Sequence, residues 1–232
     1  MAQICAYLRL LLFCLMLYET STERSFDMNQ TARNYIDLFR SVKIASAATV
    51  DEQGRPQSRI INVMIALDEG MVIVTSRGKP FWKQLVETER IALSAMCPDC
   101  QSLKFTGKVR RMEDQKKWVD AVFEHNPGMN EVYPGQSRYA LDAFLIYEGT
   151  GEWFDLLHYP ISREAFAFGG AELGPVGFRI SERCTGCGCC AAVCLQQSIR
   201  AGSPYAITPE HCLQCGLCAA SCPAQAIDRL HP

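Results

Sequence analysis

The sequence predicts a mainly β protein of the α+β class: a six-stranded antiparallel barrel with inserted helices, followed by a small domain built from a repeated βαβ unit. Three observations predict this architecture. Short runs of alternating, often β-branched residues recur between residues 44 and 112. Turn-forming residues separate those runs, as at Asp51–Pro56 and Asp68–Gly70. Near the C-terminus, one cysteine pattern occurs twice.

The first region reads as a meander of strands with helices between them. Apolar faces and capping residues predict helices at residues 29–41, 79–88 and 114–125. Alternation predicts strands at residues 44–50, 57–67, 71–76, 90–96 and 103–112, and one or two more within 143–157, interrupted near residues 149–151. Closure of these strands into a barrel would remove the exposed sheet edges.

Four segments follow from these patterns. Residues 1–28 form an apolar extension outside the fold, 29–157 form the barrel, 158–180 form a linker with fading periodicity, and 181–232 form the cysteine-rich domain. The apolar stretch within the extension is too short to span a bilayer. No small-residue cleavage site follows it. We therefore expect an extension or an artefact of start-codon choice, with a membrane-surface anchor as the alternative.

The composition of the chain argues against nucleic-acid binding and favours metal binding. The net charge of -2 provides no basic surface for a phosphate backbone, so we expect no nucleic-acid partner. Nine of the 13 cysteines lie between Cys184 and Cys222. In a chain long enough to fold without disulfides, this clustering favours thiolate metal ligation in a reducing compartment. We accordingly expect a cytoplasmic protein, with no membrane partner.

Both halves of the cysteine repeat read C-x2-C-x2-C-x3-C and lie 28 residues apart. This is the spacing of bacterial ferredoxin domains with two [4Fe–4S] clusters, in which the fourth cysteine of each run ligates the other cluster. The two predicted ligand sets are Cys184, Cys187, Cys190 and Cys222, and Cys212, Cys215, Cys218 and Cys194. The expected domain is therefore ferredoxin-like.

Zinc and disulfides account for this pattern less well. Zinc sites usually combine two cysteine pairs, and disulfides have no use for the periodicity. Leu195 stands where the second run has Pro223, but that position is not a ligand. Cys189 lies outside the pattern and is expected to be a buried, small apolar residue. Cys97 and Cys100 form a single C-x-x-C, which is expected to be a reduced turn rather than a redox pair or half of a metal site.

Three segments of the first region resemble the pyridoxamine 5′-phosphate oxidase-like, FMN-binding split-barrel superfamily. They are residues 54–61 (GRPQSRII), 74–80 (VTSRGKP) and 105–109 (FTGKV). The resemblance covers roughly residues 30–157 and implies a split β-barrel that binds FMN at a homodimer interface. The chain lacks a clear counterpart of the oxidase's C-terminal substrate-binding segment, so oxidation of pyridoxamine phosphate is not expected.

The resemblance also implies cofactor-binding residues. In the family, certain residues hold the FMN phosphate, and the matching positions here are Arg59, Thr75, Ser76 and Lys79, with Arg77 assisting. Other family residues approach the flavin, and the matching positions here are Gln101 and Ser102. Cations and hydroxyl groups at a strand-to-helix junction suit a phosphate. As alternatives, Arg59 could be a solvated strand residue, and Thr75 and Ser76 could cap the following helix. The histidines, including His125, His158 and His211, are expected to be solvated.

The expected clusters and the expected FMN together predict a redox function. Clusters pass single electrons, whereas a flavin collects two and delivers a hydride. We expect a flavin-dependent oxidoreductase that exchanges electrons with an external redox donor or acceptor and acts on a small-molecule substrate. An electron carrier or redox sensor without its own substrate is the alternative. A third possibility is a flavin-free barrel that binds haem or a deazaflavin.

Overall fold

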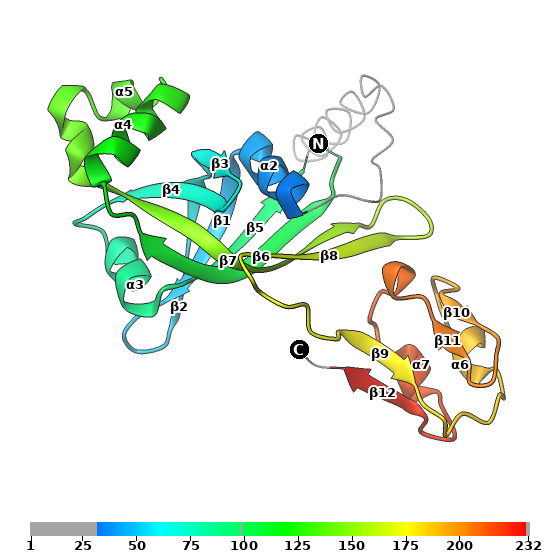
Figure 1. The fold of residues 1–232 in the computed structure, drawn as a ribbon. Coiled ribbons are helices and arrows are strands. Elements are labelled where there is room, and N and C mark those ends of the chain that lie inside the picture. Colours follow the sequence, from blue (N-terminus) through cyan, green and yellow to red (C-terminus); the bar gives the residue numbers. More distant parts are fainter. Residues whose placement is uncertain (1–31, 98, 231–232) are drawn as a thin grey trace, which may run out of the picture. The chain divides into compact units, whose positions relative to one another are not determined.

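The computed structural model describes residues 32–97 and 99–230. The expected N-terminal extension lies outside the described residues. Within them, one antiparallel sheet of eight strands has the order β2-β1-β5-β6-β7-β4-β3, and β8 pairs with β7 (Figure 1). The mainly β split-barrel architecture is confirmed, with a strand count that differs from the expected six. No helix of the described residues is both long and apolar enough to cross a membrane.

The strands of the sheet have the following bounds. They are β1 (Ile44–Val50), β2 (Pro56–Asn62), β3 (Ile65–Leu67), β4 (Gly70–Ser76), β5 (Arg90–Met96), β6 (Ser102–Arg111), β7 (Leu141–Asp155) and β8 (Ser162–Phe168). The segment predicted as one strand at 57–67 is divided by Val63 and Met64. Since β2 and β3 lie at opposite ends of the strand order but only two residues apart, the sheet must curl until its ends meet.

The helices associated with the sheet are α2 (Ala32–Val42), α3 (Pro80–Thr88), α4 (Gln115–His125) and α5 (Met129–Val132), with a 3₁₀ helix η1 (Gly135–Ala140). Pro80 occupies the first turn of α3, where its missing N–H costs nothing. Asp114 caps α4 by accepting a hydrogen bond from the Lys117 amide at 3.1 Å. Both helix starts follow the sequence pattern.

Two apolar cores lie on opposite faces of β4 and β7. The first packs α2 and α3, through residues such as Phe39 and Leu85, against the inner face of the sheet. The second packs α4, through Val122, against Val72 and Leu145. The outer face of β2, β1 and β5 has no helix over it among the described residues, and it exposes Ile44, Ile60 and Met96.

Two expectations need correction. The expected interruption near residues 149–151 is wrong, because β7 runs through it unbroken. The glycines there make room for aromatic rings: a Cβ at Gly149 or Gly151 would collide with the rings of Phe105 and Phe166, respectively. The second concerns residues 158–180, where a linker without strands was expected. That segment contains β8, which pairs with β7 from residue 149 to residue 155.

The cysteine-rich region repeats one βαβ unit. Its elements are β9 (Gly177–Ile180), α6 (Cys189–Ala192), β10 (Ile199–Arg200), β11 (Ala206–Ile207), η2 (Pro209–His211), α7 (Leu217–Ala220) and β12 (Ile227–Leu230). The first and last strands pair with each other, as do the two middle ones (Figure 1). This exchange of strands between the units brings both cysteine runs into one small fold.

Candidate functional site

The two cysteine runs have the same backbone geometry. In each, two cysteines precede a short helix, one lies within it and one follows it. The residue before each helix is a glycine in the left-handed region, Gly188 with φ 77° and Gly216 with φ 80°. An L side chain is strained in that conformation, so both loops require glycine to turn into the helix. Gln197 and Gln225 share a second positive φ, of 50° and 47°.

The first three thiols of each run lie close enough to influence one another. Burial raises the pKa of Cys190, and the charges of Cys184 and Cys187 raise it further. Burial likewise raises the pKa of Cys218, with added repulsion from the first two cysteines of its own run. Repulsion between neighbouring thiolates is relieved when a positive charge is bound, which is the behaviour of a metal-ligating set.

A cavity joins the two runs. Four of its lining residues are Cys194, Cys212, Cys215 and Cys218, the quartet that the interleaved ligand pattern predicts for one cluster. Its other walls are largely apolar, formed by residues such as Ile199, Ile207 and Leu213. The structure thus brings the fourth cysteine of the first run to the three loop cysteines of the second.

Backbone amides hydrogen-bond the sulfur atoms of the fourth cysteines. The Ser198 amide donates to Cys194 Sγ at 3.4 Å, and the Ala226 amide donates to Cys222 Sγ at 3.3 Å. Burial alone would raise the pKa of Cys194, but its hydrogen bonds with Ser198 hold that pKa below its usual value. Amides directed at sulfur stabilise a thiolate ligand, so the donor set fits an iron–sulfur cluster.

No three His, Cys, Asp or Glu side chains of residues 32–97 and 99–230 converge on a single ion position. A cubane cluster does not require such convergence, because each thiolate binds a different iron atom. The assignment of the eight cysteines to two clusters therefore stays a prediction from their spacing and from the cavity that one quartet lines.

Arg59 lies against α3. Its guanidinium donates to Thr49 Oγ1 at 2.6 Å and to Gln84 Oε1 at 2.9 Å, and it stacks 4.5 Å from the centre of the Phe81 ring. Burial lowers its pKa. Lys79 is the exposed residue immediately before the same helix. Within the part of the chain described, neither cation has a carboxylate partner, so a phosphate fits this position.

The hydroxyl groups predicted to hold the phosphate point to opposite sides of β4. Thr75 is buried on the face that carries Met71 and Ile73, where α3 packs. Ser76 lies on the other face and makes a 3.0 Å hydrogen bond with the Tyr133 hydroxyl. The structure therefore groups Thr75 with Arg59 and Lys79 on the α3 side, and separates Ser76 from them.

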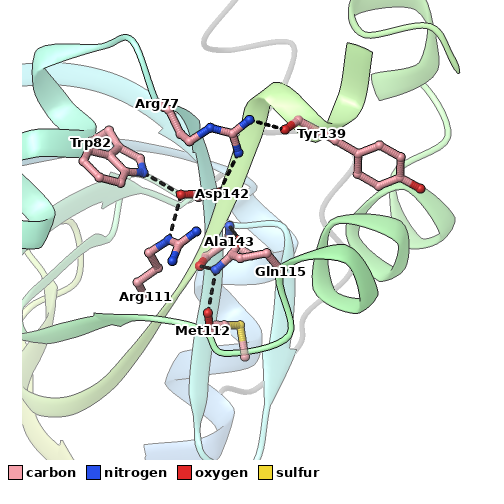
Figure 2. Close-up of polar contacts among 8 residues, drawn as sticks. All are labelled: Arg77, Trp82, Arg111, Met112, Gln115, Tyr139, Asp142 and Ala143. Carbon is pink, nitrogen blue, oxygen red and sulfur yellow. Dashed lines mark hydrogen bonds and ion pairs between the residues drawn. The ribbon is translucent and has the colours of Figure 1, made fainter. Parts of the chain in front are cut away.

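Arg77 is held by a buried carboxylate. It donates to Asp142 Oδ1 at 3.0 Å, and Arg111 and Trp82 donate to Asp142 Oδ2 at 2.7 and 2.8 Å (Figure 2). A second hydrogen bond joins Arg77 to the Tyr139 carbonyl at 2.5 Å. Two nitrogen atoms of this guanidinium are thus occupied by contacts within the protein.

Gln101 and Ser102 are separated from Thr75 along β7 in the same chain. Thr75 pairs with Asp142 at one end of β7, whereas Ser102 pairs with Phe154 near the other end. Those partners are 12 residues apart, which corresponds to roughly 40 Å of extended strand. One chain does not bring the two groups together along this strand.

Gln101 instead belongs to a buried polar network that sequence reasoning missed. It accepts a hydrogen bond from Trp153 at 3.2 Å and donates to Asp155 at 3.3 Å. Asp155 in turn lies 2.6 Å from His158 Nδ1. The solvated histidine expected at position 158 is exposed but has a buried carboxylate partner. Only the three-residue spacing of Asp155 and His158 could have suggested this contact.

The Cys97–Cys100 segment forms a hydrogen-bonded turn, with the Cys100 amide 3.0 Å from the Cys97 carbonyl. Burial raises the pKa of Cys97 to about 11, so its thiol stays protonated near neutral pH. A protonated thiol is a poor nucleophile. The expected turn is present, and its reduced state stays a prediction.

Family comparisons match both regions of the chain. Residues 32–151 match the model described as pyridoxamine 5′-phosphate oxidase, and residues 205–228 match that of the 4Fe-4S binding domain. The expected family resemblance is confirmed. A search of curated proteins finds no match.

Solved structures resemble the barrel. A NimC/NimA family protein from Clostridium acetobutylicum has 17% identity and a TM-score of 0.50, over 59% of this chain and 92% of that one. A heme binding protein from Mycobacterium smegmatis has 13% identity and a TM-score of 0.48, over 65% of this chain and 64% of that one. An FMN binding protein from Nostoc punctiforme has 13% identity and a TM-score of 0.45, over 61% and 94%. At these identities the first likeness shows the fold alone.

Proposed function

Because the chain belongs to the pyridoxamine 5′-phosphate oxidase family and also carries a 4Fe-4S binding domain, we propose that it is a flavin-dependent oxidoreductase. In this proposal, electrons pass between two [4Fe–4S] clusters and FMN, and a small organic substrate is reduced or oxidised. The coexistence of both domains in one chain fits a redox role and is the observation that carries the proposal. An external redox protein or small molecule would exchange electrons with the clusters.

Arg59, Thr75 and Lys79 are the residues that we assign to the FMN phosphate. Their support is the position of Arg59 and Lys79 at one helix without carboxylate partners among the described residues. The N-terminus of α3, with nine residues, adds a favourable field for an anion. Ser76 lies on the opposite face of β4, and the carboxylate of Asp142 neutralises Arg77, so we give those two residues no role in phosphate binding.

A homodimer is part of the proposal. The outer face of β2, β1 and β5 presents small and apolar side chains, with Ile60 and Met96 more than half exposed. An exposed apolar sheet face of this kind is typical of a protein interface. A second copy on this face could supply Gln101 and Ser102 to the site whose phosphate residues come from the first copy.

When bound, FMN would supply two-electron chemistry and the clusters one-electron transfer. The chain's own residues would bind and orient these groups. Arg59 and Lys79 neutralise the phosphate, and Phe81 and Gln84 fix the guanidinium of Arg59. Amides hold the sulfur atoms of Cys194 and Cys222 in place.

The alternative is an electron carrier or redox sensor without its own substrate. One observation favours it: the cavity described above is lined by predicted cluster ligands rather than by predicted flavin residues. A second, open groove lies beside Arg110, Glu113 and Trp118, and it too contains none of the predicted flavin residues. A carrier would reduce redox proteins without saturable turnover of a small molecule.

The test is purification without oxygen, followed by a visible spectrum and iron and flavin analysis. We expect about eight iron atoms per chain, as two clusters require, and FMN released on denaturation. Arg59→Ala and Lys79→Ala should lower flavin content without changing iron, whereas Lys117→Ala, on exposed α4, should change neither. Iron without flavin would remove the oxidoreductase proposal, and full flavin retention in both variants would refute the phosphate site.

A further inference from the structure

The end of β7 carries an Asp–His pair with an arrangement suited to proton transfer. His158 Nδ1 lies 2.6 Å from Asp155 Oδ2, and the two side chains differ sharply in exposure, at 73% and 6%. An ionised carboxylate only accepts hydrogen bonds, so Nδ1 carries the proton of this contact. The free nitrogen, Nε2, belongs to the exposed imidazole ring.

Asp155 is itself fixed from several directions. The amides of Leu157 and His158 donate to its Oδ1 at 2.9 and 3.3 Å, and Gln101 Nε2 donates to its Oδ2 at 3.3 Å. Burial alone would raise the pKa of this carboxyl, but the hydrogen bonds from His158 and the amides outweigh it and hold the pKa below its usual value. The carboxylate is therefore charged when it orients the imidazole.

A purely structural role does not explain the imidazole. The amide contacts close the turn after β7 without any side chain at position 158. His125 shows the contrast, because its Nδ1 bonds to the Ala121 carbonyl of its own helix at 2.9 Å. Fixing an exposed imidazole by a buried carboxylate is how proteins prepare a general acid or base.

The charged surroundings of the pair are simple. Asp155 is the one charged side chain bonded to His158 among the described residues, and Gln101, just before β6, and Trp153 from β7 are neutral. Cys97 and Asp99 belong to the turn before Gln101, and burial keeps the Cys97 thiol protonated. Protonation of the imidazole therefore changes the local charge from -1 to neutral at this pair.

We propose that His158, oriented by Asp155, is the acid–base group that supplies protons to the redox reaction of this protein. The inference rests on the proposed function, and it deepens it. Iron–sulfur clusters deliver electrons without protons, whereas an organic acceptor A reduced to AH2 takes two electrons and two protons. The link to the reaction site rests on the proposed homodimer, in which Gln101, hydrogen-bonded to Asp155, would reach the flavin of the second copy.

The step balances as follows. Two equivalents of a one-electron donor, such as a reduced viologen, would supply the two electrons that the acceptor takes. The Nε2–H bond of the imidazolium breaks as one N–H or O–H bond forms on the acceptor, and the second proton comes from water. The neutral imidazole, with its Nδ1–H still held by Asp155, then regains a proton from water.

The first experiment determines which ring nitrogen of His158 carries the proton. Nitrogen-15 NMR of the oxygen-free holoprotein should show the neutral His158 ring with its proton on Nδ1. Asp155→Asn should shift the population toward the Nε2–H form. A wild-type ring that carries its proton mainly on Nε2 would overturn the orientation on which the proposal depends.

The second experiment measures the rate at which reduced methyl viologen reduces the bound flavin, across a pH range. His158→Ala should lower the rate by about 100-fold, alter its pH profile, and regain activity with added imidazole. His125→Ala is the matched control and should show neither loss nor rescue. Each variant is first assayed for iron and flavin.

The outcomes separate the two ideas. A wild-type protein without flavin would overturn the proposed function and the inference with it. A His158→Ala protein with full flavin and iron but wild-type rate and pH profile would overturn only the role of His158. Loss of rate without rescue by imidazole, together with loss of flavin, would show a structural role and also count against the proposal.

Discussion

Arg77, in the loop after β4, forms an ion pair with Asp142 at the start of β7, with Nη1 3.0 Å from Oδ1. Asp142 is fully buried and also bonds to Arg111 and Trp82 (Figure 2). The side chain of Gln115 fixes the adjoining Ala143 backbone by one donated and one accepted hydrogen bond, at 3.0 and 2.7 Å. Arg77 therefore helps to tie β4, α3, β6 and β7 together through Asp142.

Asp142→Asn should destabilise the barrel by about 2 kcal/mol. Removing one partner of a buried ion pair costs more than this, but Arg77 and Arg111 are half exposed and regain water. Chemical denaturation followed by circular dichroism measures the loss. Asp68→Asn is the control, since its ion pair with Arg33 is at the surface and should contribute little. Equal losses in both variants would contradict the role assigned to Asp142.

Acid should weaken the protein partly through the same carboxyl. Burial alone would raise the pKa of Asp142, but hydrogen bonds from Arg111, Trp82 and Arg77 hold it below its usual value. The unfolded chain then binds more protons in the acid range, so this part of the stability is present above about pH 4 and is lost as the pH falls through the folded pKa. The difference in unfolding free energy between wild type and Asp142→Asn should shrink below about pH 4. A constant difference down to pH 2 would refute this linkage.

Local residue patterns predicted most strands and helices. The features that they did not predict depend on contacts between segments that are far apart in the sequence. Strands such as Ile44–Val50 and Arg90–Met96 appear in alternation and turn chemistry within a few residues. The glycines at 149–151 suggested a break because the rings that require them, Phe105 and Phe166, lie elsewhere in the sequence. The strand Ser162–Phe168 escaped notice because its identity depends on pairing with β7.

The candidate site residues show the same contrast between local pattern and distant contact. The cysteine quartets could be predicted from the sequence because three of the four ligands lie within seven residues and the run repeats. The partner of Arg77 is 65 residues away, and no local signal shows that a carboxylate occupies it. Family resemblance placed Arg77 near a phosphate, and the structure adds the tertiary contact with Asp142.

Cys194→Ala should remove one cluster. The cavity places Cys194 with the three loop cysteines of the second run, so its loss leaves that cluster with three protein ligands. We expect iron to fall from about eight to about four atoms per chain, measured on oxygen-free protein. Cys189→Ala is the matched control, because Cys189 lies outside the pattern and is exposed rather than buried as expected from the sequence. Equal iron loss in both variants would contradict the ligand assignment.

Ile60→Glu should disrupt the proposed homodimer. Ile60 is 68% exposed on the outer face of the sheet, so a charge there costs the single chain little but cannot be buried against a second copy. Analytical ultracentrifugation should show a dimer for wild type and a monomer for the variant. Val132→Glu, on α5 with similar exposure, should remain dimeric. A monomeric wild type would contradict the prediction at once.

Removal of iron should unfold the cysteine-rich region and spare the barrel. Among the described residues, the buried members of the apolar cluster in that region are Ile180, Cys190, Ile199 and Cys218, and two of these are predicted ligands. So small a core leaves most of the folding free energy to metal ligation. Hydrogen exchange after chelation should show loss of protection by at least about 100-fold in β9 and β12, while amides of Phe144 and Leu145 in β7 stay protected. Retained protection in β9 and β12 of iron-free protein would show that the region folds without its clusters.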